Sequence, residues 1–545
     1  MQGNVSNASS TALAGKPTAR MKGFERYLFP RNPLVEFLII ACLSGAISYF
    51  LMGRQIFRAN WGLIDDHVVF YFLGPHLDLS FSDIWNTLLT KTEVGTLQGR
   101  FRPGYYLFTL IETWLWGANV HLWYLARTIG FAVFLSSIWW FMRRFIGIWL
   151  SGALTLYISL LPLWADIWSR LGPSEIYGAV CIGIMAFAAY CIFFSDAART
   201  RNAGAITLTL ATIALVGMKE TFIPIAGATA ALFLLAGIRK NLSPLLIGIL
   251  AFAVFVPFCG IAIIVRQQVA ATGTDYYANA IGIWPVLRFF GMGLLAAIGR
   301  TWWVILFFAV LYYATPRKPF KSWSTATCIT LGAYGFLVVT YAAQGALYRS
   351  GFPLHSRYDF PALLLSPLSF CLLACYVFYS TRTSFSERAT NYVPFAIAAA
   401  LLLYCAVGSG NGKALSAAVR ANIEITNSFY NELQRAVRAA AALPESPVIL
   451  EAYGPGAYEA VFSLSYYMPS LGVRNPISVR LHPEDKTDGK LYDGLQQTLA
   501  GLEQAGGGTF TPLRRSLAGH PQNCVSIGIN GSPDAGCSGF RVYTR

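Results

Sequence analysis

The stretch Leu34–Gly53, LVEFLIIACLSGAISYFLMG, carries one charged side chain, Glu36. An α-helix needs about 20 consecutive apolar residues to cross the hydrocarbon core of a bilayer, and this stretch has that length. Apolar runs of the same kind recur along the chain as far as Ser409. The sequence therefore predicts a polytopic α-helical membrane protein.

The composition of the 545-residue chain supports this prediction. Hydrophobic residues make up 55% of the chain and charged residues 12%, whereas soluble domains average about 25% charged residues. A soluble helical protein of this composition would need many buried helices with almost no polar faces. We expect 11 transmembrane spans, at residues 34–53, 122–142, 145–163, 175–194, 203–218, 221–238, 242–265, 286–312, 324–345, 358–379 and 391–409.

The loops between these spans alternate in charge, and the basic side is cytoplasmic by the positive-inside rule. The basic residues on that side are Lys16, Arg20, Lys22, Arg26, Arg31, Arg143, Arg144, Arg199, Arg201, Arg239, Lys240, Arg317, Lys318, Lys321, Arg382 and Arg388. We expect a bacterial inner-membrane protein with a cytoplasmic N-terminus, no cleavable signal peptide and a periplasmic C-terminus. This distribution accounts for the net charge of +15 without a nucleic-acid partner.

The chain divides into a cytoplasmic tail (1–33), a transmembrane domain (34–409) and an exterior soluble domain (410–545). An amphipathic pattern after the breaker Gly410-Asn411-Gly412 predicts a helix from Ile423 to Ala442. Apolar runs typical of strands follow it, so we expect a small α/β domain. The predicted strands contain Val448–Leu450, Ile477–Val479, Val525–Ile529 and Phe540–Tyr543.

Two of the ten cysteines, Cys524 and Cys537, lie in this exterior domain, and the other eight lie in predicted spans. Two cysteines that close a short loop in an oxidising compartment predict a disulfide. A zinc site would need more ligands of the right kind nearby than this tail contains.

The exterior loop 54–121 contains one further apolar piece, Tyr105–Trp116. As a span it would be short, and it would move Arg143 and Arg144 to the exterior side. Its Trp and Tyr residues are typical of the membrane–water interface, so we expect an amphipathic helix that lies flat on the outer membrane surface.

The candidate catalytic acids begin with Asp65 and Asp66, which follow the first span and precede His67. A carboxylate at a membrane boundary can deprotonate a hydroxyl group within hydrogen-bond distance, and low dielectric raises its pKa toward the useful range. A polar anchor or a helix N-cap is the structural alternative. The residue pair does not tell which carboxylate would act as the base.

Arg100 and Arg102 flank Phe101 and precede Pro103, which can start the surface helix. Guanidinium groups bind phosphate oxygens in pairs and stabilise a departing phosphate. These two arginines are therefore candidates for substrate binding, with contact to lipid headgroups as the alternative.

Three further candidates lie at later span boundaries, namely Glu175, Arg170 and Lys219. Glu175 opens the fourth span, either as a second active-site carboxylate with Arg170 beside it or as an acid favoured at a helix N-terminus. Lys219 precedes the sixth span and either contacts phosphate or pairs with Glu220.

The last candidates are His355, Arg357 and Tyr358, next to the start of the tenth span. Arg357 is placed to contact a phosphate and Tyr358 a sugar, and interfacial anchoring is the alternative.

Other chemistry has little support in the sequence. A phosphate-binding loop of the type G-x-x-x-x-G-K-[ST], an H-E-x-x-H pair and a G-x-S-x-G turn are all missing from it. We expect no cofactor, and we leave open a divalent cation at Asp65, Asp66 and Glu175, since hard cations prefer oxygen ligands.

The order of these motifs resembles that of the GT-C class of integral-membrane glycosyltransferases. Asp65-Asp66-His67-Val68 is similar to the Asp-Glu-x-His-Phe stretch of protein O-mannosyltransferases, although its His follows the acids directly. The segments Phe101–Tyr106 and Trp116–Asn119, followed by Arg127, are similar to a loop of the aminoarabinose transferase that acts on lipid A. The likeness covers residues 34–200 best.

The resemblance implies transfer of a sugar from a polyprenyl-phosphate donor to an envelope glycan or lipid acceptor, outside the cytoplasm. It implies a single inverting displacement, with an Asp as general base and arginines on the lipid phosphate. A polysaccharide polymerase or ligase is the alternative among enzymes. A lipid-linked sugar transporter or flippase is the alternative outside them, although broken helices with charges near midmembrane are not evident in the sequence.

Overall fold

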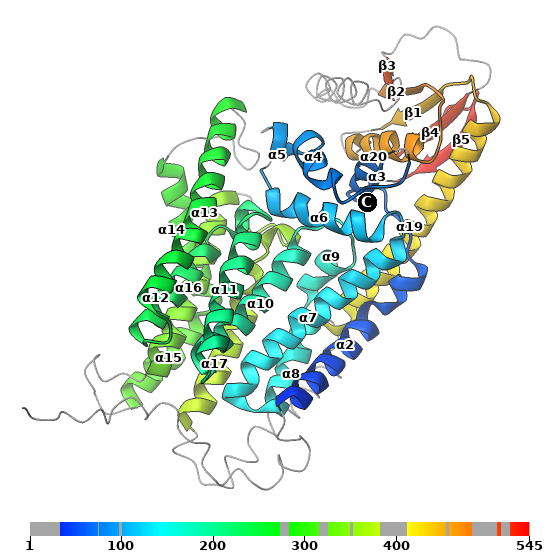
Figure 1. Cartoon of the computed structure of the whole chain (residues 1–545). Helices are drawn as coiled ribbons and strands as arrows, with labels where there is room; N and C mark the ends of the chain where they lie inside the picture. The colour runs from blue at the N-terminus through cyan, green and yellow to red at the C-terminus, as the bar shows by residue number, and fades with distance from the viewer. Residues whose placement is uncertain are drawn as a thin grey trace, which may run out of the picture.

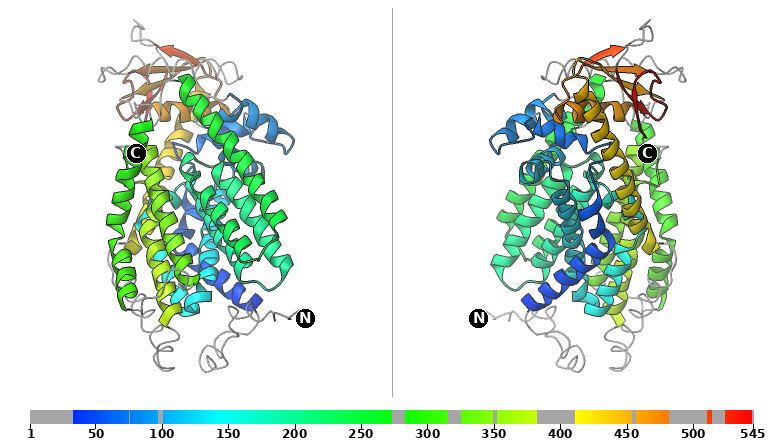
Figure 2. Two further views of the ribbon diagram at one scale, coloured as in Figure 1. Left: turned by 90° about the vertical axis from the view of Figure 1, so that its left-hand side faces the viewer. Right: turned by 90° about the vertical axis from the view of Figure 1, so that its right-hand side faces the viewer.

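The computed structural model describes residues 33–74, 76–96, 101–272, 283–314, 325–348, 352–381, 411–453, 457–481, 510–513 and 524–543. Most of them form a bundle of long helices, and a parallel sheet lies at one end of it (Figure 1). The side views place the start of α2 (Pro33–Arg58) at the opposite end of the bundle from the sheet (Figure 2).

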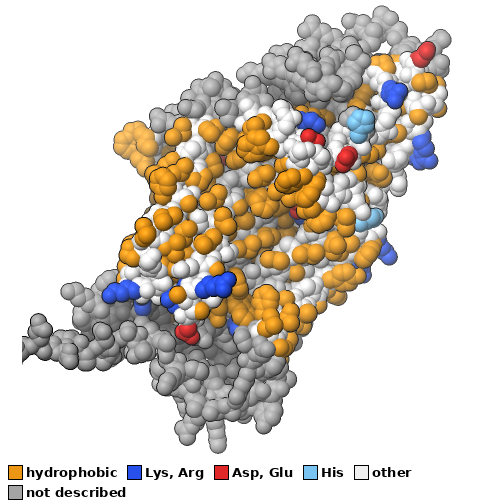
Figure 3. Space-filling model, in the orientation of Figure 1, with side chains coloured by type: hydrophobic (Ala, Val, Ile, Leu, Met, Phe, Trp, Pro, Cys, Tyr) orange, Lys and Arg blue, Asp and Glu red, His pale blue; other side chains and the backbone are white. Residues whose placement is uncertain are grey.

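Among the described residues, six helices are long and apolar enough to cross a membrane, so the protein is a polytopic helical membrane protein. These segments are Leu34–Arg58, Val120–Arg143, Glu175–Phe194, Glu220–Ile238, Pro244–Ile264 and Ile283–Arg300. A seventh candidate is a pair of helical segments, Ile148–Ser159 and Pro162–Trp168, that bends by 52°. Few charged side chains interrupt the hydrophobic surface of this bundle (Figure 3).

The helices of the bundle have the following bounds. They are α2 (Pro33–Arg58), α7 (Val120–Ile146), α8 (Ile148–Ser159), η1 (Pro162–Trp164), α9 (Ala165–Trp168), α10 (Glu175–Phe194), α11 (Ala198–Val216), η2 (Glu220–Phe222), α12 (Ile225–Ile238), α13 (Pro244–Thr272), α14 (Ile283–Arg300), α15 (Trp302–Ala314), α16 (Thr325–Tyr348), η5 (Arg357–Asp359), η6 (Ala362–Leu364) and α17 (Leu365–Thr381).

The predicted count of 11 spans is therefore not reproduced among the described residues. The span expected at 286–312 consists of two helices, α14 and α15, which meet at Thr301. The span expected at 358–379 begins with two short 3₁₀ turns and becomes α-helical only at Leu365. The span expected at 391–409 lies outside the described residues.

The described part of the loop between α2 and α7, predicted to be exterior, forms four short helices: α3 (His67–Leu73), α4 (Asp83–Thr90), α5 (Glu93–Thr96) and α6 (Pro103–Trp116). In Figure 1, α6 runs across the ends of the bundle helices near α10 and α11, in the way expected of a surface helix. It starts at a proline, whose fixed φ suits the first helical turn.

Gly104 brings α6 into close contact with the end of α11. Its N–H donates to the carbonyl of Gly217 at 2.8 Å. A Cβ atom at Gly104 would lie 2.9 Å from both the carbonyl oxygen of Ala214 and the carbonyl carbon of Gly217, so a larger residue would push the helix away. This contact fixes Arg102 at the start of α6.

The C-terminal domain is built on a five-stranded sheet in the order β3-β2-β1-β4-β5, with every neighbouring pair parallel. Its elements are β1 (Val448–Ala452), α20 (Ala457–Ser470), β2 (Ile477–Leu481), β3 (Phe510–Leu513), β4 (Val525–Ile529) and β5 (Ser538–Val542). The four predicted strands and the disulfide between Cys524 and Cys537 are present, and β3 is an additional strand.

One helix, α19 (Asn411–Ala442), joins the bundle to the sheet. It starts 12 residues before the predicted Ile423, so Gly412 lies inside it. Near its start, Leu415 and Val419 are buried in the core of the bundle. Farther along, Leu433 and Ala440 are buried in the core that α19 shares with the sheet. The helix thus belongs to both parts of the molecule.

Candidate functional site

The acids at 65 and 66 are neighbours in sequence and have different environments. Asp65 has a left-handed backbone, with φ of 72°, and its side chain is 34% exposed. Asp66 is 5% exposed, and its carboxylate accepts a hydrogen bond from the N–H of Gly62 at 2.7 Å. Asp66 occupies the N-cap position of α3 without capping it through its side chain. Asp65 is therefore the more accessible carboxylate.

Asp65 contacts a cation from a distant part of the chain. The guanidinium of Arg357 donates to Oδ2 of Asp65 at 3.3 and 3.4 Å. Gly172 lies directly against Asp65, since a Cβ atom there would come within 2.2 Å of the Asp65 Cβ. Tyr105 of α6 donates to the carbonyl of Gly172 at 3.0 Å. Two distant segments, at Gly172 and Arg357, therefore contact Asp65, and α6 joins them through Tyr105.

Asp66 has a pKa raised to about 7, chiefly because burial disfavours the charged form; the nearby Asp65 also raises the pKa, and the hydrogen bond from Gly62 opposes the change. Between about pH 4 and 7, the folded protein therefore keeps a proton on Asp66 that the unfolded chain has already released. This acid favours the folded state below about pH 4, and that contribution disappears as the pH rises through 7.

We expect Asp66→Asn to remove this pH dependence, because the amide oxygen can still accept from Gly62 and never ionises. Relative to the variant, the wild type should lose about 4 kcal/mol of unfolding free energy between pH 4 and pH 8. Thermal unfolding of both proteins in detergent over that range measures the difference. Parallel curves at all pH values would contradict a buried, titrating Asp66.

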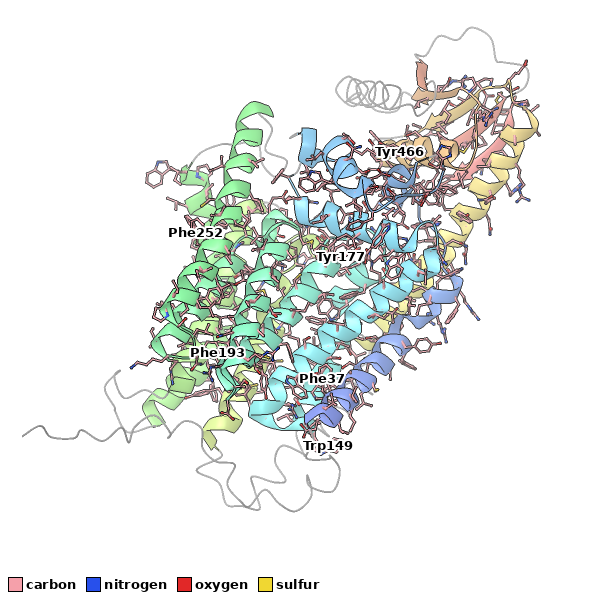
Figure 4. The ribbon with its side chains drawn as sticks, viewed as in Figure 1. Phe37, Trp149, Tyr177, Phe193, Phe252 and Tyr466 are labelled. Carbon is pink, nitrogen blue, oxygen red and sulfur yellow. A yellow bond between two sulfur atoms is a disulfide. The ribbon has the colours of Figure 1, made fainter. Side chains whose placement is uncertain are left out.

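His67 contacts the C-terminal domain. Its Nδ1 lies 2.8 Å from Oγ of Ser463, and its ring stacks on Tyr466 with 5.5 Å between centroids; Tyr466 is labelled on α20 in Figure 4. Burial lowers the pKa of His67 to about 4, so the ring is neutral at pH 7. A neutral ring in this position supplies no charge for a substrate phosphate.

A second group of charges lies at the start of α10. Nζ of Lys219 is 2.5 Å from Oε1 of Glu175, and the two side chains are 1% and 3% exposed. The same Nζ lies 4.6 Å from the ring centroid of Tyr358, and the guanidinium of Arg357 lies 5.3 Å from that centroid. Tyr358 therefore links the Glu175–Lys219 pair to the Asp65–Arg357 pair.

Arg102 pairs with Glu220, with N–O distances of 3.1 and 3.4 Å. Because Glu220 follows Lys219 directly, this ion pair adjoins the second group. The structure thus brings together predicted site residues from the loop, α6, α10, the α11–η2 connection and the segment before α17. They are Asp65, Arg102, Glu175, Lys219, Arg357 and Tyr358.

The remaining candidates lie at the margin of this group. Arg170 forms a loose pair with Asp166 at 3.9 Å, and Oδ2 of Asp166 accepts from the backbone N–H of Arg357 at 3.1 Å. His355 donates its backbone N–H to the buried Asp359 at 2.7 Å, a contact that shapes the turn before η5. Arg100 lies outside the described residues.

Glu112 and Tyr177, which were not among the predicted site residues, complete a buried cluster with Arg127. The two terminal guanidinium nitrogens of Arg127 donate to the Glu112 carboxylate, at 2.8 and 2.7 Å, and Nη2 also bonds to the Tyr177 hydroxyl at 2.9 Å. Tyr177 lies on α10, below α6 in Figure 4. The cluster fixes α6 to α7 and α10. Its signal in the sequence was one acid, Glu112, inside an otherwise uncharged stretch.

The charges of this site are balanced in ion pairs. Asp65, Glu175, Glu220 and Asp166 are matched by Arg357, Lys219, Arg102 and Arg170. Within the described part of the chain, no group of three or more His, Cys, Asp or Glu side chains is arranged to hold a metal ion. The arrangement offers a partly exposed carboxylate beside several cationic donors, which suits removal of a proton next to a developing negative charge.

Comparison with known proteins yields no family. No protein-family model matches the chain, and no curated protein matches it significantly.

Proposed function

We propose that this protein is a membrane glycosyltransferase of the GT-C class. It transfers a sugar from a polyprenyl-phosphate donor to an envelope glycan or lipid acceptor on the periplasmic side of a bacterial inner membrane. The observation that supports this best is the pair formed by Asp65 and Arg357, in which the carboxylate is still 34% exposed. A base that is both accessible and held by a cation suits attack by an acceptor hydroxyl.

The proposed step is a single displacement with inversion. Asp65 takes the proton of the acceptor hydroxyl as its oxygen bonds to the anomeric carbon of the sugar. The bond from that carbon to the phosphate oxygen breaks, and its electron pair leaves with the polyprenyl phosphate. Arg357 and Arg102 stabilise the charge that develops on the phosphate.

The other named residues have supporting roles in this proposal. Lys219 and Glu175 form a buried pair that holds Tyr358 and, through it, the Arg357 side of the site. Asp66 holds the backbone of the acidic loop through Gly62. The assignment of Asp65 rather than Asp66 as the base rests on this difference in exposure and bonding.

The function is tested by comparing cells that produce the protein with cells that lack its gene. Mass spectrometry of their membrane lipids and envelope glycans should show a sugar present only in the first strain. The producing strain should also accumulate free polyprenyl monophosphate when its donor pool is fed. Identical glycan profiles in the two strains would contradict the proposed activity.

We expect Arg102→Ala to weaken binding of a polyprenyl monophosphate by about tenfold or more, because a hydrogen bond to a charged group typically contributes that much to the affinity. The measurement is a titration of the purified protein in detergent. Because the variant also leaves Glu220 unpaired, the double variant Arg102→Ala, Glu220→Gln should bind equally weakly. Arg58→Ala is the matched control, since Arg58 is exposed at the end of α2. Equal affinity for Arg102→Ala and the control would point to headgroup anchoring.

A further inference from the structure

The C-terminal domain contacts the acidic loop through one helix, α20. The buried ring of Tyr467 packs against Phe70 of α3 at 4.7 Å between centroids and against Phe429 of α19 at 5.6 Å. The side chain is 0% exposed. Tyr467 therefore lies where the exterior loop, α19 and the C-terminal domain meet.

Tyr467 also makes a polar contact with the loop. Its hydroxyl donates to the carbonyl of Gly62 at 2.7 Å, while the N–H of Gly62 donates to the carboxylate of Asp66 at 2.7 Å. A Cβ atom at Gly62 would lie only 3.0 Å from that carboxylate. The backbone of Gly62 is thus held on one side by the C-terminal domain and on the other by the loop itself.

A second contact holds the other end of the loop. The Ser463 hydroxyl donates its single hydrogen to the carbonyl of Glu459 at 2.9 Å, so it accepts the hydrogen on Nδ1 of His67 at 2.8 Å. Ser463 and Tyr467 are four residues apart on α20, which places them on one face of the helix. This face contacts the loop at Gly62 and His67, on both sides of Asp65 and Asp66.

Asp65 between these two contacts has a positive φ of 72°. For a residue other than glycine this conformation costs about 1–2 kcal/mol, so it persists only where the surroundings hold it. The carbonyl of Asp65 accepts from the N–H of Val68 at 3.3 Å, and its carboxylate accepts from Arg357. On both sides of Asp65, contacts from α20 hold the loop at Gly62 and His67. The conformation of this loop thus depends on these local contacts together with a helix that follows it by about 400 residues.

We propose that Tyr467 is a positioning residue for the proposed base: through Gly62 it sets the conformation of the loop that carries Asp65. This inference rests on the proposed function. It gives the C-terminal domain a role in turnover. Tyr467 touches neither donor nor acceptor, so its loss should affect the rate of transfer and leave donor binding intact.

The test compares Tyr467→Phe with Tyr453→Phe in the full-length protein. Both variants keep the aromatic ring and lose one hydroxyl that donates to a backbone carbonyl, since Tyr453 donates to Ser532 at 2.8 Å within the C-terminal domain. Hydrogen–deuterium exchange in detergent should be about tenfold faster in the peptide covering residues 61–69 for Tyr467→Phe. It should be unchanged there for Tyr453→Phe.

Two further readouts separate positioning from loss of structure. Affinity for a polyprenyl monophosphate should stay within about twofold of the wild type in Tyr467→Phe, while the transferred sugar in cells falls about tenfold. Wild-type exchange at 61–69 would overturn the inference, and so would faster exchange with undiminished sugar transfer. If cells with Asp65→Asn still contain the transferred sugar, the proposed function is wrong. In that case the exchange result still shows whether α20 holds the loop.

Discussion

Asp65→Asn is expected to abolish the proposed sugar transfer while the protein stays folded. A general base typically contributes a factor of about 10²–10⁴ to the rate, and an amide cannot take the acceptor proton. The asparagine oxygen can still accept from Arg357. Loss of this ion pair should cost little stability, because the side chain of Asp65 is 34% exposed and such pairs are worth about 1 kcal/mol or less.

The measurement is the amount of transferred sugar in membranes from cells that carry each variant at equal protein level. Asp78→Asn serves as the matched control, since Asp78 is exposed in the same loop between α2 and α7 and should behave as the wild type. Asp66→Asn should retain most of the transfer, because its amide can replace the hydrogen bond to Gly62. Full transfer by Asp65→Asn would exclude Asp65 as the base.

Lys219→Met is expected to lower the free energy of unfolding by about 3–5 kcal/mol. The substitution leaves the carboxylate of Glu175 buried without its cation, and removal of one partner from a buried ion pair has a cost of about that size. The methionine retains most of the volume of the lysine side chain. Lost packing should therefore contribute little to the effect.

A double-mutant cycle isolates the charge effect. Glu175→Gln combined with Lys219→Met should recover most of the lost stability, because no uncompensated charge then remains. The exposed pair Arg435 and Glu432 is the control, and Glu432→Gln should change stability by about 0.5 kcal/mol or less. Thermal unfolding in detergent gives all values. A Lys219→Met variant as stable as the wild type would contradict the burial of this pair.

The membrane character and the ends of several helices could be predicted from the sequence, because they depend on local properties. Pro103 begins α6, and Glu175 begins α10 after Pro173, as helix-start preferences indicate. The break between α14 and α15 was missed, although residues 299–301 (Gly-Arg-Thr) interrupt the apolar run at that point. The strand β3 was missed because it is four residues long and contains Pro512, a residue that strands tolerate mainly at sheet edges.

The choice of ion-pair partners depended on backbone geometry that the sequence does not show. Because Lys219 and Glu220 are adjacent in sequence, an ion pair between them was the structural alternative to phosphate binding. In the structure Lys219 bonds to Glu175, and Glu220 bonds to Arg102. The backbone at Lys219 is extended, with φ of −165° and ψ of 149°, so it and its neighbour point to opposite sides. The contact between Asp65 and Arg357 joins residues 292 positions apart, which spacing alone cannot reveal.

The passage of α19 through both cores has a consequence for the order of assembly. A ribosome makes the acidic loop early, yet the partners of that loop in α19 and α20 come after every described helix of the bundle. Leu415 and Val419 fill their places in the bundle equally late. During synthesis the loop that carries Asp65 therefore lacks its partners in α19 and α20 at first. It matures only when the last quarter of the polypeptide has been released and packed.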